Sequence, residues 1–204
     1  RRELRAFHGQ AAAQQVTTPV FHIHGADAPA STMVVPFAML LNLASVSAAE
    51  DKDKLWGFIQ RYAPDASPEA NPDLDAAAGF AVRYYKDFVE PTKEFRLPDA
   101  KEKAALEALV VALQSDEAAL AVIAEKNAKE GKDMPLPEVN WADDEFHQSI
   151  VFAGGKVHEF EPRRAWFSCL YEVLLGAKQG PRFGWFIALY GREESIALIE
   201  AGLR

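Results

Sequence analysis

Cationic and aromatic side chains alternate in one stretch of the sequence, from Val173 to Arg192. This stretch contains no acidic residue, although the whole chain carries 30 Asp and Glu residues against 22 Lys and Arg residues. Guanidinium groups and aromatic rings hold unstacked RNA bases, and cations bind the neighbouring phosphates. An alternative is that the rings form a hydrophobic core and the cations a solvated rim, which composition alone favours. The candidate RNA-binding residues are Lys178, Arg182, Phe183, Trp185 and Arg192.

Other residues that could take part in catalysis or bind a metal ion do not form a complete site. His22 and His24 could bind a metal ion together with Asp27 if this segment is extended, because side chains two apart on extended backbone point the same way. No cysteine pair or distant histidine cluster completes four ligands, so a hydrogen-bonded loop is the simpler interpretation. Cys169 lies on an apolar helical stripe and is expected to be a buried structural thiol. No phosphate-cradling glycine loop occurs, and we predict no catalytic residue and no metal ligand in this chain.

Length and composition describe an ordinary globular chain. It has 204 residues, of which 49% are apolar and 25% charged, and a net charge of −8. The acidic total argues against broad, charge-driven binding to nucleic acid but leaves room for one basic surface. No apolar run is long enough to cross a membrane, no signal peptide is recognisable, and a single cysteine fits the cytoplasm. The first residue is Arg rather than Met, which is typical of a piece of a longer product.

The hydrophobic pattern predicts an all-α protein built as a multi-helix bundle. We interpret residues 1–30 as a connector and 31–204 as a helical domain, with a possible subdivision near 131–141, where two prolines mark a loop. Local signals predict where helices begin: Asp51, Asp99 and Ser115 are placed as N-caps. An interruption is expected at the glycine pair 154–155. The predicted helices cover 34–44, 52–62, 72–89, 100–113, 116–130, 144–153, 162–175, 183–190 and 193–203.

Two long blocks resemble a known enzyme family. The segment WFSCLYEVLLGAKQGPRFGWFIALYG, Trp166 to Gly191, closely resembles the C-terminal signature of class I lysyl-tRNA synthetases. A second block, His22 to Asp99, is similar to the helical region that precedes this signature in the same family. The order and approximate separation of the blocks also agree, so the resemblance covers nearly the whole chain.

The resemblance implies that the chain is the C-terminal, α-helical anticodon-binding portion of a lysine–tRNA ligase, similar to the α-helical cage of class I synthetases. ATP, with Mg, and lysine would then bind in a catalytic domain that precedes Arg1, and this chain alone would be inactive. Its expected partners are the anticodon arm of lysine tRNA and that upstream domain.

The same resemblance gives roles to individual residues. Lys178 and Arg182 become candidate contacts to the RNA backbone, and Phe183 or Trp185 a candidate surface for base stacking. Two more cations, Arg163 and Arg164, become secondary phosphate contacts, and Arg192 completes the expected surface. Two other interpretations stay open: a stand-alone helical protein-interaction module, and a metal-binding regulatory domain that uses the two histidines at 22 and 24.

Overall fold

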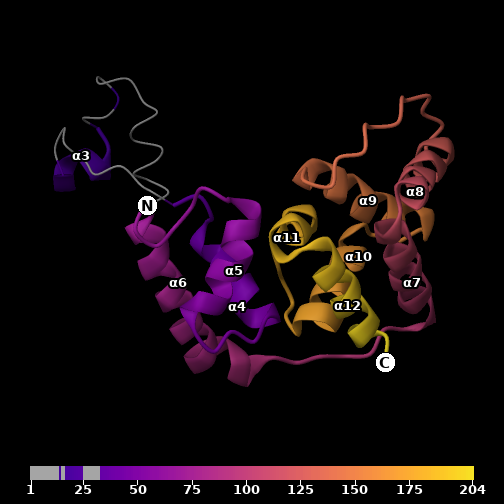
Figure 1. Cartoon of the computed structure of the whole chain (residues 1–204). Helices are drawn as coiled ribbons and strands as arrows, with labels where there is room; N and C mark the ends of the chain where they lie inside the picture. Colours follow the sequence, from indigo (N-terminus) through magenta and orange to yellow (C-terminus); the bar gives the residue numbers. More distant parts are fainter. Residues whose placement is uncertain (1–13, 15–16, 25–32) are drawn as a thin grey trace.

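The computed structural model describes residues 14, 17–24 and 33–204, and every regular element in these residues is a helix (Figure 1). The all-α prediction is therefore confirmed for the described part of the chain, whereas the likeness to a synthetase cage stays a prediction. No helix in the described ranges is long and apolar enough to cross a membrane. In chain order the elements are α3 (Pro19–His24), α4 (Phe37–Val46), α5 (Lys52–Tyr62), α6 (Pro72–Tyr84), a π-helical turn η2 (Tyr85–Val89), a 3-10 turn η3 (Glu90–Thr92), α7 (Ala100–Gln114), α8 (Asp116–Lys129), α9 (Asp144–Val157), α10 (Arg164–Cys169), a π-helical segment η4 (Leu170–Leu175), α11 (Phe183–Tyr190) and α12 (Arg192–Gly202).

Three of the predicted caps form as expected. The Asp51 carboxylate accepts a hydrogen bond of 3.0 Å from the backbone N–H of Lys54, which starts α5. Asp99 and Glu102 form a reciprocal capping box at the start of α7, with hydrogen bonds of 2.8 and 2.9 Å. The hydroxyl of Ser115 caps α8 in the same manner. Each cap satisfies a backbone N–H that has no partner inside its helix.

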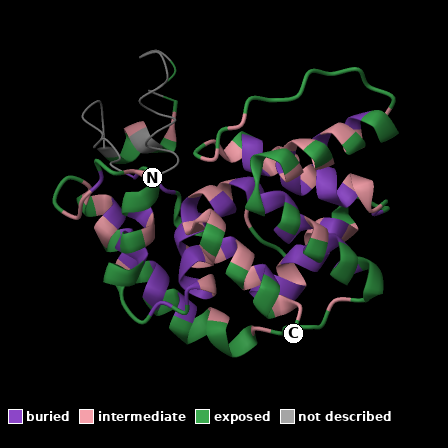
Figure 2. Ribbon diagram, turned by 45° about the vertical axis from the view of Figure 1, so that its right-hand side comes forward, coloured by how far each residue is buried: buried purple, intermediate pink, exposed green. Residues whose placement is uncertain are grey.

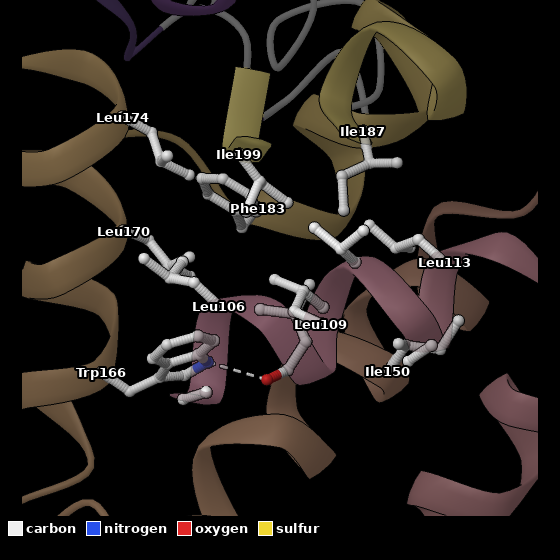
Figure 3. Close-up of a cluster of buried hydrophobic side chains, with 14 of the residues drawn as sticks. Leu106, Leu109, Leu113, Ile150, Trp166, Leu170, Leu174, Phe183, Ile187 and Ile199 are labelled. Atoms are coloured by element: carbon white, nitrogen blue, oxygen red, sulfur yellow. Dashed lines mark hydrogen bonds between the residues drawn. The ribbon is translucent and has the colours of Figure 1, made fainter. Parts of the chain in front are cut away.

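The helices enclose two hydrophobic clusters. The first lies among α4, α5 and α6, on the left of Figure 1, and the second among α7 to α12. In the second cluster, side chains from α7, α9, α10, η4 and α12 gather with those of Phe183 and Ile187 of α11 (Figure 3). The indole N–H of Trp166 donates a 2.8 Å hydrogen bond to the carbonyl of Val151. Apart from Leu189, the buried residues of the first cluster lie between Met33 and Tyr85 in the sequence, and those of the second lie between Ala105 and Ile199.

The loop between α8 and α9 was the predicted place for a subdivision. Most of residues 131–141 are exposed, as the long green loop in Figure 2 shows. However, α8 and α9 pack against each other and contribute to the same cluster, so this loop does not separate two cores. The predicted domain limits at 1–30 and 31–204 remain a prediction.

One predicted interruption is wrong. Helix α9 continues through Gly154 and Gly155 to Val157, and Gly155 makes room for a large neighbour. A Cβ atom on Gly155 would lie 2.5 Å from Cδ1 of Trp166, closer than real side chains approach. Here glycine serves helix packing and does not end the helix.

Helix α11 connects the two clusters. Leu189 belongs to the first cluster, while Phe183, Phe186 and Ile187 belong to the second. The close approach of α11 to α9 depends on Gly184, where an added Cβ would lie 2.4 Å from the backbone nitrogen of Gln148.

We predict that Gly184→Ala destabilises the protein by about 3 kcal/mol, because the new methyl group meets helix backbone that can yield only by separating α9 from α11. Urea unfolding followed by circular dichroism measures the change. The matched control is Gly79→Ala, at a helical position with nothing within 4 Å of the new Cβ. This control is expected to stabilise by about 0.5–1 kcal/mol, as alanine does within helices. Equal changes in the two variants would contradict the role of Gly184.

Candidate nucleic-acid interface

Arg182, a predicted phosphate contact, lies at the start of α11 and is paired with acids of α9. Its guanidinium donates to Asp144, with 3.3 Å between nitrogen and oxygen, and to Glu145. The pairing with Glu145 raises the pKa of Arg182, and the same contact lowers the pKa of Glu145. The side chain is still 44% exposed. A phosphate could therefore reach Arg182, but it would compete with two carboxylates.

The two aromatic candidates differ from each other. Phe183 is completely buried, with its ring 5.3 Å from that of Phe186, so it has no exposed face on which a base could stack. For this residue the core interpretation is correct and the stacking role is wrong in the folded chain. Trp185 is half-buried and lies beside Tyr62, at 6.4 Å between ring centroids. Its indole N–H is buried without a hydrogen-bond partner.

The remaining predicted cations lie in different places. Arg192 covers the ring of Trp141 at 4.4 Å, and Arg163 covers that of Phe152 at the same distance. In these cation–π contacts each guanidinium group interacts with an aromatic ring of the fold and is therefore less available to a ligand. Arg164 is exposed on the first turn of α10. Only Lys178 among the predicted residues lines the large cavity described next.

This cavity, of about 680 Å³, lies where the segment after η3 passes the loop after η4. Its wall therefore combines two sets of residues: those that come after the first hydrophobic cluster in the sequence, and those that lie beside the second cluster. A backbone hydrogen bond of 3.1 Å, from the N–H of Glu94 to the carbonyl of Gly176, joins the two sides. The lining residues are Val89, Thr92, Lys93, Glu94, Phe95, Arg96, Glu172, Gly176, Ala177 and Lys178.

Arg96 forms the rigid part of the cavity wall. Its two terminal nitrogens donate to the carboxylate of Glu102 at 2.6 and 2.7 Å, and its Nε donates to Glu172 at 2.6 Å. Charge-assisted, bidentate pairs of this kind are short and strongly oriented. Because Arg96 is fully engaged, it positions the wall and is not free to bind a ligand.

Lys93 and Phe95 lie side by side in another part of the cavity wall. The Lys93 ammonium donates a hydrogen bond of 2.6 Å to the carbonyl of Ser45. It lies 5.3 Å from the ring centroid of Tyr85 and 5.4 Å from that of Phe95. No carboxylate of the described residues forms an ion pair with it. Burial lowers the pKa of Lys93 because the ammonium has lost part of its hydration, although nearby Glu90 opposes this. Phe95 is 60% exposed.

Sequence reasoning missed the exposed aromatic residues. Phe80, Tyr84 and Phe88 follow one another at intervals of four on the outer face of α6 and η2, and are 45–63% exposed. Their spacing was a usable signal, because positions four apart share one face of a helix. The opposite face of α6, which includes Ala78 and Val82, is buried in the core.

The other chemical candidates are inert or lie outside the described residues. Cys169 is completely buried, which confirms the predicted buried thiol, and this burial raises its pKa to about 12. His22 lies on helix α3, where residues two apart do not share a face, so the extended geometry assumed for the pair with His24 is wrong. Asp27 lies outside the described residues. Within the described ranges, no group of three potential ligands could hold a metal ion.

The Arg96–Glu102 pair predicts a specific pH dependence of stability. Hydrogen bonding to Arg96 lowers the pKa of Glu102 below 4.5 in the folded protein. The unfolded chain then binds a proton at higher pH than the folded chain does, so the stabilising effect is complete above about pH 5 and is lost as the pH falls. Glu102→Gln should lower the free energy of unfolding by about 2 kcal/mol at pH 7 and by less below pH 4.

Urea unfolding of both proteins from pH 7 to pH 3.5 measures this difference. The control is Glu107→Gln, an exposed change on the same helix, for which we expect little effect at any pH. A destabilisation by Glu102→Gln that is constant over the whole range would contradict the ion pair as its cause.

Comparison with known proteins gives a consistent family of relatives. The chain is 55% identical over 201 residues to a lysine–tRNA ligase of Roseobacter denitrificans, and 36% identical over 192 residues to those of Rickettsia felis and Rickettsia conorii. These alignments cover 98%, 94% and 94% of this chain but 34%, 32% and 33% of the relatives. No family model matches the chain, and no solved structure does so. Almost the whole chain is thus similar to a segment that makes up about a third of lysine–tRNA ligases.

Proposed function

We propose that this chain is the C-terminal, anticodon-binding portion of a class I lysyl-tRNA synthetase, the enzyme that attaches lysine to its tRNA with ATP. The observation that carries the proposal is the 55% identity to a lysine–tRNA ligase over 98% of the chain. The resemblance of residues 166–191 to the C-terminal signature of the class I enzymes supports the finer assignment. The all-helical structure of the described residues agrees with a binding role.

In this proposal the chemistry takes place in another part of the enzyme. ATP, with Mg, and lysine bind in a catalytic domain that precedes Arg1, and this chain holds the anticodon arm of the lysine tRNA. Holding one end of the tRNA orients the distant acceptor end toward the reacting groups, which lowers the entropic cost of the reaction. The enzyme acts in the cytoplasm.

The exposed cations are the proposed contacts to the RNA. Lys178 and Arg164 are exposed, and Arg182 is exposed in spite of its two acidic partners. Arg163 and Arg192 lie over aromatic rings, which keeps their guanidinium planes fixed. In an acidic protein, a small number of such cations gives a weak electrostatic attraction.

We predict that the 204-residue chain binds a lysine-tRNA anticodon stem-loop weakly and with a shallow dependence on salt. Each phosphate contact contributes about 0.7 to the slope of log affinity against log salt for single strands, so two or three contacts give a slope of roughly −1.5 to −2. Fluorescence anisotropy titrations at several salt concentrations measure it. Arg182→Ala should make the slope shallower if Arg182 binds phosphate, and should reduce discrimination between anticodons if it contacts a base.

Circular dichroism of Arg182→Ala provides the control for folding. A folded variant with unchanged affinity, slope and anticodon preference would make Arg182 a solvated rim residue. Failure of the native chain to bind any tRNA would favour a stand-alone protein-interaction module instead.

We also predict that the purified chain, on its own, shows neither lysine-dependent ATP–pyrophosphate exchange nor tRNA charging, because its sequence contains no nucleotide-binding motif. Joined to its catalytic domain, it should support charging of lysine tRNA. Exchange activity in a preparation free of other synthetases would refute the proposal that catalysis takes place in another part of the enzyme.

A further inference from the structure

The ring of Phe95 is exposed and held in place. An added Cβ at Gly176 would lie 3.0–3.1 Å from three atoms of this ring, so the ring rests directly against the glycine. Gly176 has a φ of +62°, a conformation that favours glycine for a second reason. Phe95 nevertheless keeps 60% of its surface exposed. An aromatic ring that is both fixed and accessible is a surface on which a nucleic-acid base can stack.

Two lysines lie in the wall beside this ring. The ammonium of Lys93 lies 5.4 Å from the centroid of the Phe95 ring and forms no direct ion pair within the described residues, although Glu90 lies near enough to act on its charge. Lys178 is exposed in the loop after η4 and also lines the cavity. Two acids also line the cavity. Glu172 is paired with Arg96, so Glu94 in the wall and Glu90 near Lys93 are the acids that oppose an anion there. The cavity thus presents an exposed ring and two cations in a protein whose net charge is −8.

We propose that this cavity binds one unpaired nucleotide of RNA, with its base stacked on Phe95 and its phosphate bound by Lys93 and Lys178. The proposal rests on the RNA-binding function proposed above. The volume of about 680 Å³ falls within the range of small-ligand sites, roughly 300–1,000 Å³, and accommodates a nucleotide.

An unpaired nucleotide fits these observations better than an apolar peptide does. A peptide docking on Phe95 would gain from hydrophobic burial but would leave the charges of Lys93 and Lys178 partly desolvated and unpaired. A nucleotide uses both features, because each base has a π-face and each linkage carries a negative charge. Paired bases cannot stack in this way, since their faces are covered within the double helix.

Phe95→Ala tests the stacking directly, in the complete 204-residue chain. We expect about tenfold weaker binding of a lysine-tRNA anticodon stem-loop and unchanged binding of a blunt RNA duplex with the same stem. Phe95→Trp should restore binding because it keeps an aromatic surface. The matched control is Leu97→Ala, on the same segment, which is 73% exposed and does not line the cavity. Circular dichroism and thermal unfolding show that each variant is folded.

Lys178→Gln tests the phosphate contact. Its salt slope should be shallower than that of the native chain by about 0.7, whereas Lys103→Gln, which removes an exposed charge on α7, should leave the slope unchanged. Lys93 is unsuitable for this test because its hydrogen bond to Ser45 also joins two parts of the fold.

The outcomes separate this inference from the proposed function. If the native chain binds the stem-loop but Phe95→Ala binds it as tightly as Leu97→Ala does, the nucleotide site is wrong and RNA binding stands. If the native chain binds no RNA, the proposed function fails, and the nucleotide site fails with it. Selective loss of stem-loop binding in Phe95→Ala, with recovery in Phe95→Trp, supports the site.

Discussion

The close contact between α9 and α11 is the constraint on which the rest of the structure depends. At Gly184 the two helices approach so closely that no side chain fits, and the Gly184 N–H donates a 2.9 Å hydrogen bond to the side chain of Gln148. This contact places Phe183 and Ile187 in the second hydrophobic cluster while Leu189, on the same short helix, reaches the first. The eight residues of α11 therefore join the two cores directly.

Most of the strong ion pairs hold distant segments together. Arg61 pairs with Glu194 between α5 and α12, and Arg182 pairs with α9. Arg96, in the segment after η3, pairs with both Glu102 of α7 and Glu172 of η4. These pairs hold that segment against the helices of the second cluster. Charges used in this way are unavailable to a ligand unless it displaces a carboxylate. The cations without acidic partners are therefore the ones most accessible to an anionic ligand.

The cavity beside Phe95 lies at the second connection between the two cores. Its walls depend on the hydrogen bond from Glu94 to Gly176 and on the contact between Lys93 and Ser45 of α4. A ligand bound there would contact elements from both cores at once and would resist their separation, because it binds the folded arrangement alone. In the proposed synthetase, tRNA bound at this place would thus stabilise the relative placement of the two cores.

The sequence by itself determined most of the helices and the starts of three of them. Asp51, Asp99 and Ser115 could be identified as caps because each acts on a backbone group three residues away, and such short-range interactions are encoded in neighbouring residues. The buried face of α6 was equally predictable, since it follows the helical period. The similarity to lysine–tRNA ligases also needed only the sequence.

Only the tertiary structure decided which residues are available to a partner. Phe183 and Phe95 are the same residue type near cations, yet one is completely buried and the other 60% exposed. Gly155 and Gly176 likewise differ in role, one making room for Trp166 inside a helix and the other supporting an exposed ring. Burial and ion pairing depend on segments that are distant in sequence and adjacent in space, as Arg182 and Glu145 are, and the spacing of residues along the chain contains no record of those neighbours.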